Sequence, residues 1–152
     1  MDYELDFNAV SSSALAAHAC SKELKKFRRT YKRGGWEAVW KHPEAPRWAY
    51  WYADRVIKGP WPPGEAAIAS SPYCSLGYAR DVIGGPWPPG EEIIASSPEC
   101  SLGYARDVLR APWPPGEEAI ASSPYCSLEY ARDVLRAPWP PGEAAIVIMA
   151  KK

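Results

Sequence analysis

The sequence predicts an all-α fold, a short α-solenoid of about four 26-residue helix-pair repeats with a basic helix at its N-terminus. The first observation behind this prediction is a period of 26 residues at which two aromatic positions recur: Trp61, Trp87, Trp113 and Trp139; Tyr52, Tyr78, Tyr104 and Tyr130. The second is that apolar residues inside each repeat recur at helical spacing. The third is the lack of the period-two alternation and dense β-branching that a β-solenoid, the alternative repeat fold, requires.

The repeats divide the chain into two predicted parts. Four units begin at proline residues and form an array over residues 46–149: Pro46, Pro72, Pro98 and Pro124. Residues 1–45 are predicted to form an N-terminal, basic, helical capping segment. The chain has 152 residues, a length typical of one domain, so we expect both parts to fold together. The second and third units differ at only five positions and should share one structure.

Each unit is predicted to begin with a helix, and in the last three units a Ser-Pro pair opens it. In the second unit Ser71 can cap free backbone N–H groups, and Pro72 at the first helical position loses no hydrogen bond. An apolar stripe at helical spacing is expected to face the core: Cys74, Ser75, Tyr78, Ala79, Val82 and Ile83. The other side of this helix is expected to be exposed: Tyr73, Gly77, Arg80 and Asp81.

The Trp-Pro-Pro-Gly segment that follows, residues 87–90 in the second unit, is predicted to be a rigid, extended connector with a proline placed to start a second helix. Its indole is expected to wedge between units. A second helix of about two turns should follow, with acidic residues at its N-terminus, where the helix dipole favours them. Because so short a helix is not stable alone, it must stack on neighbouring units.

The repeat resembles a known but weakly defined pattern. Tyr-Ala-Arg-Asp-Val-Ile/Leu followed by Pro-Trp-Pro-Pro-Gly-Glu is similar to the Y-A-x-x-V-I-x-G-x-W-P-E repeats of uncharacterised phage and bacterial proteins, and residues 52–62 fit it best. The resemblance covers residues 46–149 and supplies no catalytic residue. It implies a small soluble protein that is phage-borne. By analogy with phage proteins of this size, its function would be to inhibit a host complex such as a CRISPR-type nuclease.

Composition argues against an enzyme. The chain has two histidines, and its three array cysteines occupy one repeat position, where we expect small buried side chains: Cys74, Cys100 and Cys126. No acid, base, nucleophile or C-x-x-C set converges, so we expect no catalytic residue, no cofactor and no metal. No apolar run approaches the roughly 18 residues of a membrane span. The acidic start MDYELDFNAV is unlike a signal peptide, so we expect a cytoplasmic protein, in the host cytoplasm if phage-encoded.

The net charge of zero hides two opposed regions. Residues 21–58 carry 11 Lys/Arg against 4 Asp/Glu, whereas residues 59–150 carry 5 against 11. The basic region contains aromatic residues as well, a combination that can bind phosphate and stack bases. Candidate nucleic-acid contacts are Lys25, Lys26, Arg28, Arg29, Lys32 and Arg33. The other interpretation is an amphipathic capping helix whose solvent face is basic.

An Arg-Asp pair recurs in three units, at residues 80–81, 106–107 and 132–133. It could bind an anion in every unit. The structural alternative is a ladder of ion pairs between units, for instance from Arg80 to Asp107 or to a glutamate at a neighbouring helix start.

These observations favour a non-enzymatic protein–protein interaction module, with nucleic-acid binding through the basic aromatic region as the alternative. Candidate partner-binding residues are unit-varying positions and helix-start acids: Tyr73, Glu99, Tyr125, Glu91, Glu92, Glu117 and Glu118. The last unit ends in apolar residues where earlier units have Ala-Ser-Ser: Val147, Ile148 and Met149. Solenoid ends normally need a polar cap, so this end is predicted to pack back on the array or to form a homodimer.

Overall fold

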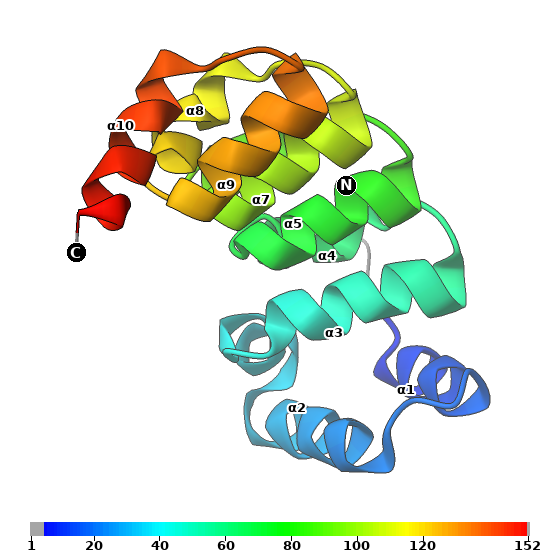
Figure 1. Cartoon of the computed structure of the whole chain (residues 1–152). Coiled ribbons are helices and arrows are strands. Elements are labelled where there is room, and N and C mark those ends of the chain that lie inside the picture. The colour runs from blue at the N-terminus through cyan, green and yellow to red at the C-terminus, as the bar shows by residue number, and fades with distance from the viewer. Residues whose placement is uncertain (1–4, 152) are drawn as a thin grey trace. The chain divides into compact units, whose positions relative to one another are not determined.

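The computed structural model describes residues 5–151; residues 1–4, which begin the acidic N-terminal stretch and the predicted capping segment, and residue 152 lie outside the described part. Within residues 5–151 the chain folds into helices joined by short turns, without a strand, and neighbouring helices pack in pairs (Figure 1). The predicted fold class, a short α-solenoid of helix-pair repeats, is therefore confirmed.

The chain forms two compact units, residues 1–68 and 69–152. The first contains α1 (Phe7–Ala16), α2 (Ser21–Lys41), α3 (Ala45–Tyr52), the π-helical η1 (Ala53–Ile57) and α4 (Pro62–Ile68). The first repeat thus belongs to the same compact unit as the N-terminal segment. The division predicted at residue 45 follows the repeat boundary and remains a prediction.

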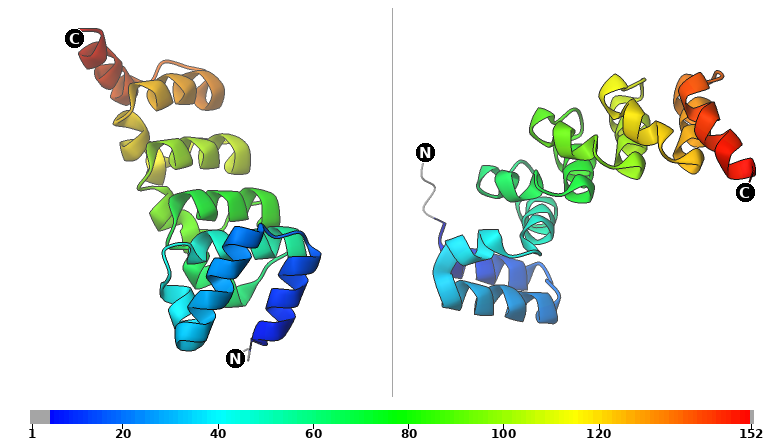
Figure 2. Two further views of the ribbon diagram at one scale, coloured as in Figure 1. Left: turned by 90° about the horizontal axis from the view of Figure 1, so that it is seen from below. Right: turned by 90° about the vertical axis from the view of Figure 1, so that its left-hand side faces the viewer.

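The second unit contains the other three repeats, each with a first helix, a π-helical continuation and a second helix. These are α5 (Pro72–Gly77), η2 (Tyr78–Ile83) and α6 (Pro88–Ile94); α7 (Pro98–Gly103), η3 (Tyr104–Leu109) and α8 (Pro114–Ala121); α9 (Pro124–Glu129), η4 (Tyr130–Leu135) and α10 (Pro140–Ala150). Within this unit the first helices α5, α7 and α9 lie side by side, as do their π-helical continuations (Figure 2).

In the second unit the first helix of each repeat begins with the predicted N-cap and continues as a π-helix. Ser71 accepts a hydrogen bond from the backbone N–H of Cys74, the N-cap expected for a Ser-Pro start. The second half is π-helical and closes on a left-handed residue, Gly84 in the second repeat and Arg110 in the third. Left-handed backbone suits glycine better than arginine, because glycine has no Cβ.

The expectation of an extended connector is wrong for the two prolines, whereas a proline does start the second helix as expected. Pro88 and Pro89 lie inside α6, and Trp87, the N-cap residue, has φ of −131° and ψ of 86°. The physical reason is that the ring of proline fixes φ near the helical value, while its missing N–H would have no partner in the first turn anyway. The Pro-Pro-Gly sequence therefore starts the second helix and does not act as a spacer.

The tryptophan that precedes each second helix packs on that helix's glycine. A Cβ on Gly90 would lie 2.6 Å from Cε3 of Trp87 and 2.9 Å from Cβ of Ser75, and the same crowding recurs at Gly64, Gly116 and Gly142. Trp87 and Tyr78 are both buried, with their rings 4.7 Å apart. The repeated tryptophan is thus a core residue of its own repeat.

One expectation about the faces of the first helix is wrong, and the predicted burial of its serine is confirmed. Gly77 and Gly103, placed on the exposed side, are buried, and a Cβ on Gly103 would lie 2.9 Å from Cδ2 of Leu76 in the preceding repeat. Adjacent first helices therefore approach closely at this point, although the fourth repeat has Glu129 at the same position. The polar Ser101 in the predicted apolar stripe is fully buried, and its hydroxyl donates to the carbonyl of Ile94 at 3.1 Å.

The glycine under the tryptophan gives a direct test of this packing. Gly90→Ala should lower the free energy of unfolding by about 1–3 kcal/mol, since the added methyl group must displace an indole or a helix. Urea denaturation followed by circular dichroism measures it. Gly85→Ala is the matched control, because a Cβ there meets nothing within 4 Å and the third repeat already has Ala111 at this position. Equal stability losses in the two variants would contradict the proposed packing.

Candidate functional site

The candidate site lies on the exposed face of the first helices of the second unit. Tyr73, Glu99 and Tyr125 follow the helix-starting proline of α5, α7 and α9, and all three are exposed. The two tyrosines are each 66% exposed, which is unusual for so large an apolar ring. Because α5, α7 and α9 lie side by side, the three residues form a row across successive repeats.

The helix-start glutamates divide into two kinds. Glu92 and Glu118 are exposed, as a partner-binding role requires. Glu91 and Glu117 are half-buried, and each accepts a hydrogen bond of 2.7 Å from a tyrosine of the next repeat, Tyr104 and Tyr130 respectively. The second pair therefore joins repeats to one another.

The hydroxyl of each of these tyrosines makes two hydrogen bonds to the preceding repeat, an arrangement that we call the tyrosine relay. The hydroxyl of Tyr104 accepts the backbone N–H of Trp87 at 3.0 Å while donating to Glu91. Burial, followed by the hydrogen bond to the glutamate, raises the pKa of Tyr104 to about 12. Tyr130 makes the same relay to Trp113 and Glu117, and its pKa is raised to about 12 for the same reasons.

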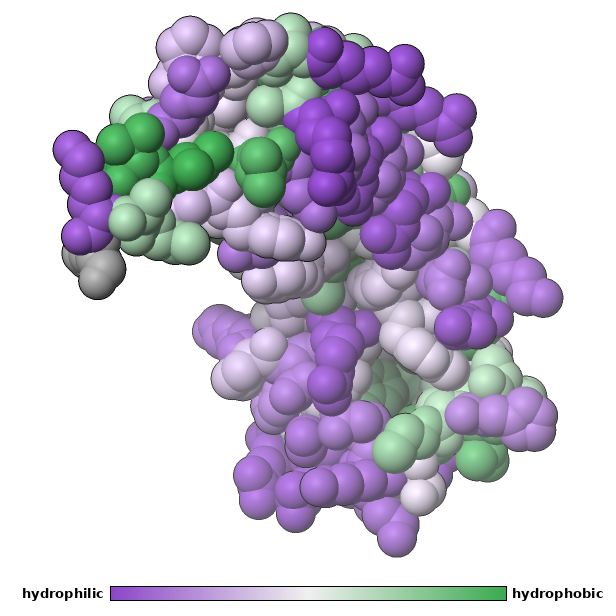
Figure 3. Space-filling model, viewed as in Figure 1, coloured by the Kyte–Doolittle hydropathy of each residue, from purple (hydrophilic) through white to green (hydrophobic). Residues whose placement is uncertain are grey.

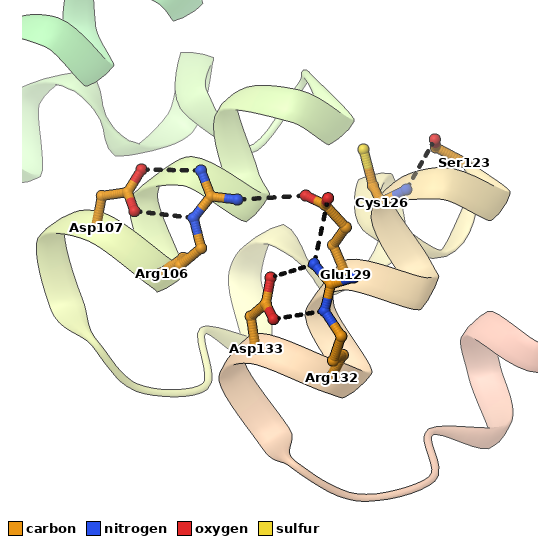
Figure 4. A network of polar contacts seen from close by, with 7 residues as sticks. All are labelled: Arg106, Asp107, Ser123, Cys126, Glu129, Arg132 and Asp133. Atoms are coloured by element: carbon orange, nitrogen blue, oxygen red, sulfur yellow. Dashed lines mark hydrogen bonds and ion pairs between the residues drawn. The ribbon is translucent and has the colours of Figure 1, made fainter.

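The repeated arginine and aspartate form an ion pair within their own repeat, as Figure 4 shows for the third and fourth repeats. Arg106 donates to both carboxylate oxygens of Asp107, at 2.8 and 3.1 Å, and Arg132 does the same to Asp133. The expected ladder of Arg–Asp pairs between units is therefore wrong for these arginines, because the adjacent aspartate already occupies one edge of each guanidinium. Glu129 adds an ion pair between the third and fourth repeats by accepting from Arg106 at 3.3 Å, and it also accepts from Arg132 of its own repeat at 3.4 Å. Such exposed ion pairs contribute at most about 1 kcal/mol each.

The candidate nucleic-acid contacts all lie on α2 but are not equivalent. Lys26 pairs with Glu23 at 3.2 Å, and Arg28 donates to the hydroxyl of Ser11 on α1. The remaining four are exposed: Lys25, Arg29, Lys32 and Arg33.

The aromatic residues that were expected to accompany this basic face are engaged inside the first unit. The indole N–H of Trp36 donates to the carbonyl of Leu5, and that of Trp48 donates to Glu23. A kink at Gly34 and Gly35, where φ of Gly35 is 65°, separates the basic part of α2 from its tryptophans. The nucleic-acid alternative stays a prediction.

The apolar C-terminal residues are exposed on α10, where Figure 3 shows hydrophobic surface. Val147, Ile148 and Met149 are accompanied by Leu128 of α9, which is 56% exposed. The equivalent Leu102, one repeat earlier, is 4% exposed. The leucine surface that is buried in the third repeat is therefore exposed in the last one.

Comparisons with protein-family models, with curated proteins and with solved structures found no match to this chain. Within residues 5–151 no helix is long and apolar enough to cross a membrane. The same residues contain no group of three or more His, Cys, Asp or Glu side chains arranged to hold a metal ion. Cys100 and Cys126 are buried, Cys74 is half-buried, and burial raises the pKa of the Cys100 and Cys126 thiols.

Sequence reasoning missed the tyrosine–glutamate relay, although a signal for it exists. Tyr104 and Tyr130 each follow a glutamate by 13 residues, half of the repeat period. A buried hydroxyl needs a hydrogen-bond partner. A glutamate that precedes both of these tyrosines by 13 residues was therefore a candidate partner for each.

The buried tyrosines predict a loss of stability at alkaline pH. A folded-state pKa of about 12 for Tyr104 and Tyr130 lies above the ordinary value of 10. The stabilisation from the neutral phenols is therefore complete below pH 10 and is lost as pH rises through about 12. Absorbance at the tyrosinate band, followed alongside circular dichroism, should show that Tyr104 and Tyr130 ionise only as pH approaches 12, together with loss of the helical signal.

The double variant Tyr104→Phe/Tyr130→Phe serves as the control, since it should lose these late-ionising groups. Ionisation of all tyrosines together near pH 10, in a chain that keeps its native circular dichroism, would contradict the relay.

Proposed function

We propose that this protein is a non-enzymatic protein–protein interaction module that binds its partner through the exposed row of first-helix residues. One observation carries the proposal: the second and third repeats keep every fully buried residue and differ only at half-buried or exposed positions. The buried Ser, Tyr and Trp positions are identical, while Tyr73 is replaced by Glu99 and Gly84 by Arg110, all four of them exposed. Variation outside the buried core is what a common scaffold with a specific binding face requires.

Tyrosine is well suited to this role. Its ring supplies a large contact area at the cost of few rotatable bonds, and its hydroxyl tolerates water before binding, so tyrosine is enriched among the residues that dominate binding energy. Tyr73 and Tyr125 keep their rings exposed although neighbouring positions of the same helices are buried. Their spacing by two repeats suits a partner that spans the row.

Charge supports a basic partner surface. Residues 59–150 carry a net charge of −6, and Glu92 and Glu118 leave their carboxylates exposed. Acidic surfaces speed association with basic ones and compete for sites that bind nucleic acid. Together with the resemblance to phage-type repeats, this extends the proposal to a phage-encoded inhibitor of a bacterial defence or regulatory complex, such as a CRISPR-type nuclease.

The exposed tyrosines provide the test. The tagged full chain should capture a specific partner from bacterial lysate, as identified by mass spectrometry, and Tyr73→Ala/Tyr125→Ala should weaken that binding at least about tenfold, because each ring is worth on the order of 1 kcal/mol or more at an interface centre. Binding is measured by biolayer interferometry with the purified partner.

The matched control is Ser96→Ala/Ser122→Ala, two exposed substitutions that remove only local bonds to Ile93 and Ala119. A partner that binds the tyrosine variant as tightly as the control, with both variants natively folded, would refute the proposed surface.

We propose in addition that the C-terminal end pairs with a second copy of the chain. Leu128 of α9 and the apolar residues of α10 are exposed, and these two helices pack on each other, whereas the equivalent Leu102 of the third repeat is buried. Two identical ends can cover one another about a two-fold axis, because such an axis brings the same patch from each copy together.

Light scattering after size exclusion should therefore report a dimer. Ile148→Glu should yield a monomer, since it places an unpaired charge in an apolar contact. Ser122→Glu, at the same repeat position one unit earlier, should leave the dimer intact. A monomeric wild-type chain at micromolar concentration, or identical behaviour of the two variants, would disprove the pairing.

A further inference from the structure

The first unit contains a hollow that the proposed interaction function does not use. The cavity has a volume of about 360 Å³ and is lined by residues of α1, α2, α3 and the segment before α4. Figure 3 shows a recess with a hydrophobic floor between α1 and α3. Its walls are mainly aromatic: Phe27, Trp36, Trp40, Trp48, Trp51 and Trp61.

These rings form a connected cage. Trp36 stacks on Trp40 with ring centroids 5.4 Å apart, and Trp40 lies 6.0 Å from Trp61. Phe27 and Trp48 meet edge to face at 5.7 Å. Because these five rings contact one another, this part of the wall is preformed and presents both ring faces and ring edges to the interior of the cavity.

Two of the tryptophans are particular to the first repeat. One period later, the positions of Trp48 and Trp51 hold Cys74 and Gly77. In the third repeat the same positions, Cys100 and Gly103, are buried against neighbouring helices. The helix pair does not itself need tryptophan at these positions. In the first unit both indoles remain partly exposed and line the cavity.

The charged groups in the wall cancel. Glu23 accepts from the indole of Trp48 at 3.0 Å and from Arg47 at 3.2 Å, and it also pairs with Lys26 at 3.2 Å. The Trp48 hydrogen bond, helped by Lys26 and Arg47, lowers the pKa of Glu23 to about 2. Arg47 in turn pairs with Glu44 at 2.9 Å. The carboxylate is thus ionised but already neutralised by two cations.

This arrangement discriminates between ligand classes. An aromatic cage attracts cations when a carboxylate is available to balance them, but here Arg47 already lines the wall and occupies the carboxylate. Ring edges and faces favour another ring over an aliphatic group of equal area. A volume of 360 Å³ lies at the lower end of small-molecule pockets, which are concave, mostly apolar and preformed.

We propose that the first unit binds an uncharged, planar aromatic molecule of one or two rings in the cavity between α1, α2 and α3. The ring stacks within the tryptophan cage, and Trp48 is fixed for this purpose by its bond to Glu23. This binding site is separate from the row of Tyr73, Glu99 and Tyr125 in the second unit, so the two proposals stand or fall independently.

Indole is the probe for this site, and phenyltrimethylammonium and cyclohexanol are the cationic and aliphatic comparisons. Nuclear magnetic resonance of the ¹⁵N-labelled full chain should show saturable shifts of the Trp48 and Trp51 indole N–H signals on adding indole. Indole should bind at least about tenfold more tightly than either comparison compound, given the paired carboxylate and the aromatic wall.

Trp51→Ala should weaken indole binding at least about tenfold by removing one wall of the cage, whereas Trp51→Phe should retain most of it. The Phe variant also reports on folding, because it keeps a ring at the same place. Tyr73→Ala, in the other unit, is the control that should bind indole like the wild-type chain. Absence of saturable shifts, tighter binding of phenyltrimethylammonium, or equal binding by Trp51→Ala and the control would overturn the proposal.

Discussion

The contact on which the repeats depend is a tryptophan lying on a glycine with almost no space between them. In each repeat the indole fills the place where a side chain of that glycine would stand, so the second helix can pack directly on the first. In the second unit the backbone of the same tryptophan is then bonded by a tyrosine of the next repeat. One residue therefore fills the core of its own repeat and fixes the position of the following one.

Because buried residues make the contacts within and between repeats, the exposed residues can vary without disturbing the fold. The Trp, Tyr and Ser positions, and the glycine under each tryptophan, are identical from the second repeat to the fourth. The bond from tyrosine to the half-buried glutamate recurs with them. What remains adjustable is the exposed row that begins at Tyr73 and the two ends of the chain. The two ends differ in kind: the first unit carries a preformed aromatic cavity, while the last repeat carries an apolar surface.

Period and helical spacing were enough to predict the fold class, the repeat number and the Ser-Pro helix starts. They could not place Gly103, because a glycine at an exposed register and one at a helix crossing look the same in a sequence; only the neighbouring Leu76 distinguishes them. Likewise, Pro88 and Pro89 favour both extended chain and a first helical turn, and the packing of Trp87 decides between them. The aromatic cavity was beyond sequence reasoning, since it depends on how α1 and α2 meet α3.

The uniform junction between repeats also makes the length of the array adjustable. Each repeat of the second unit opens with the same Ser-Pro pair, and the relay from Tyr104 to Trp87 and Glu91 recurs one period later with the same geometry. Removing residues 98–123 would join Ser97 to Pro124 and recreate an existing boundary. Duplication or loss of whole units in the gene therefore changes the reach of the binding face without creating an interface that the chain does not already contain.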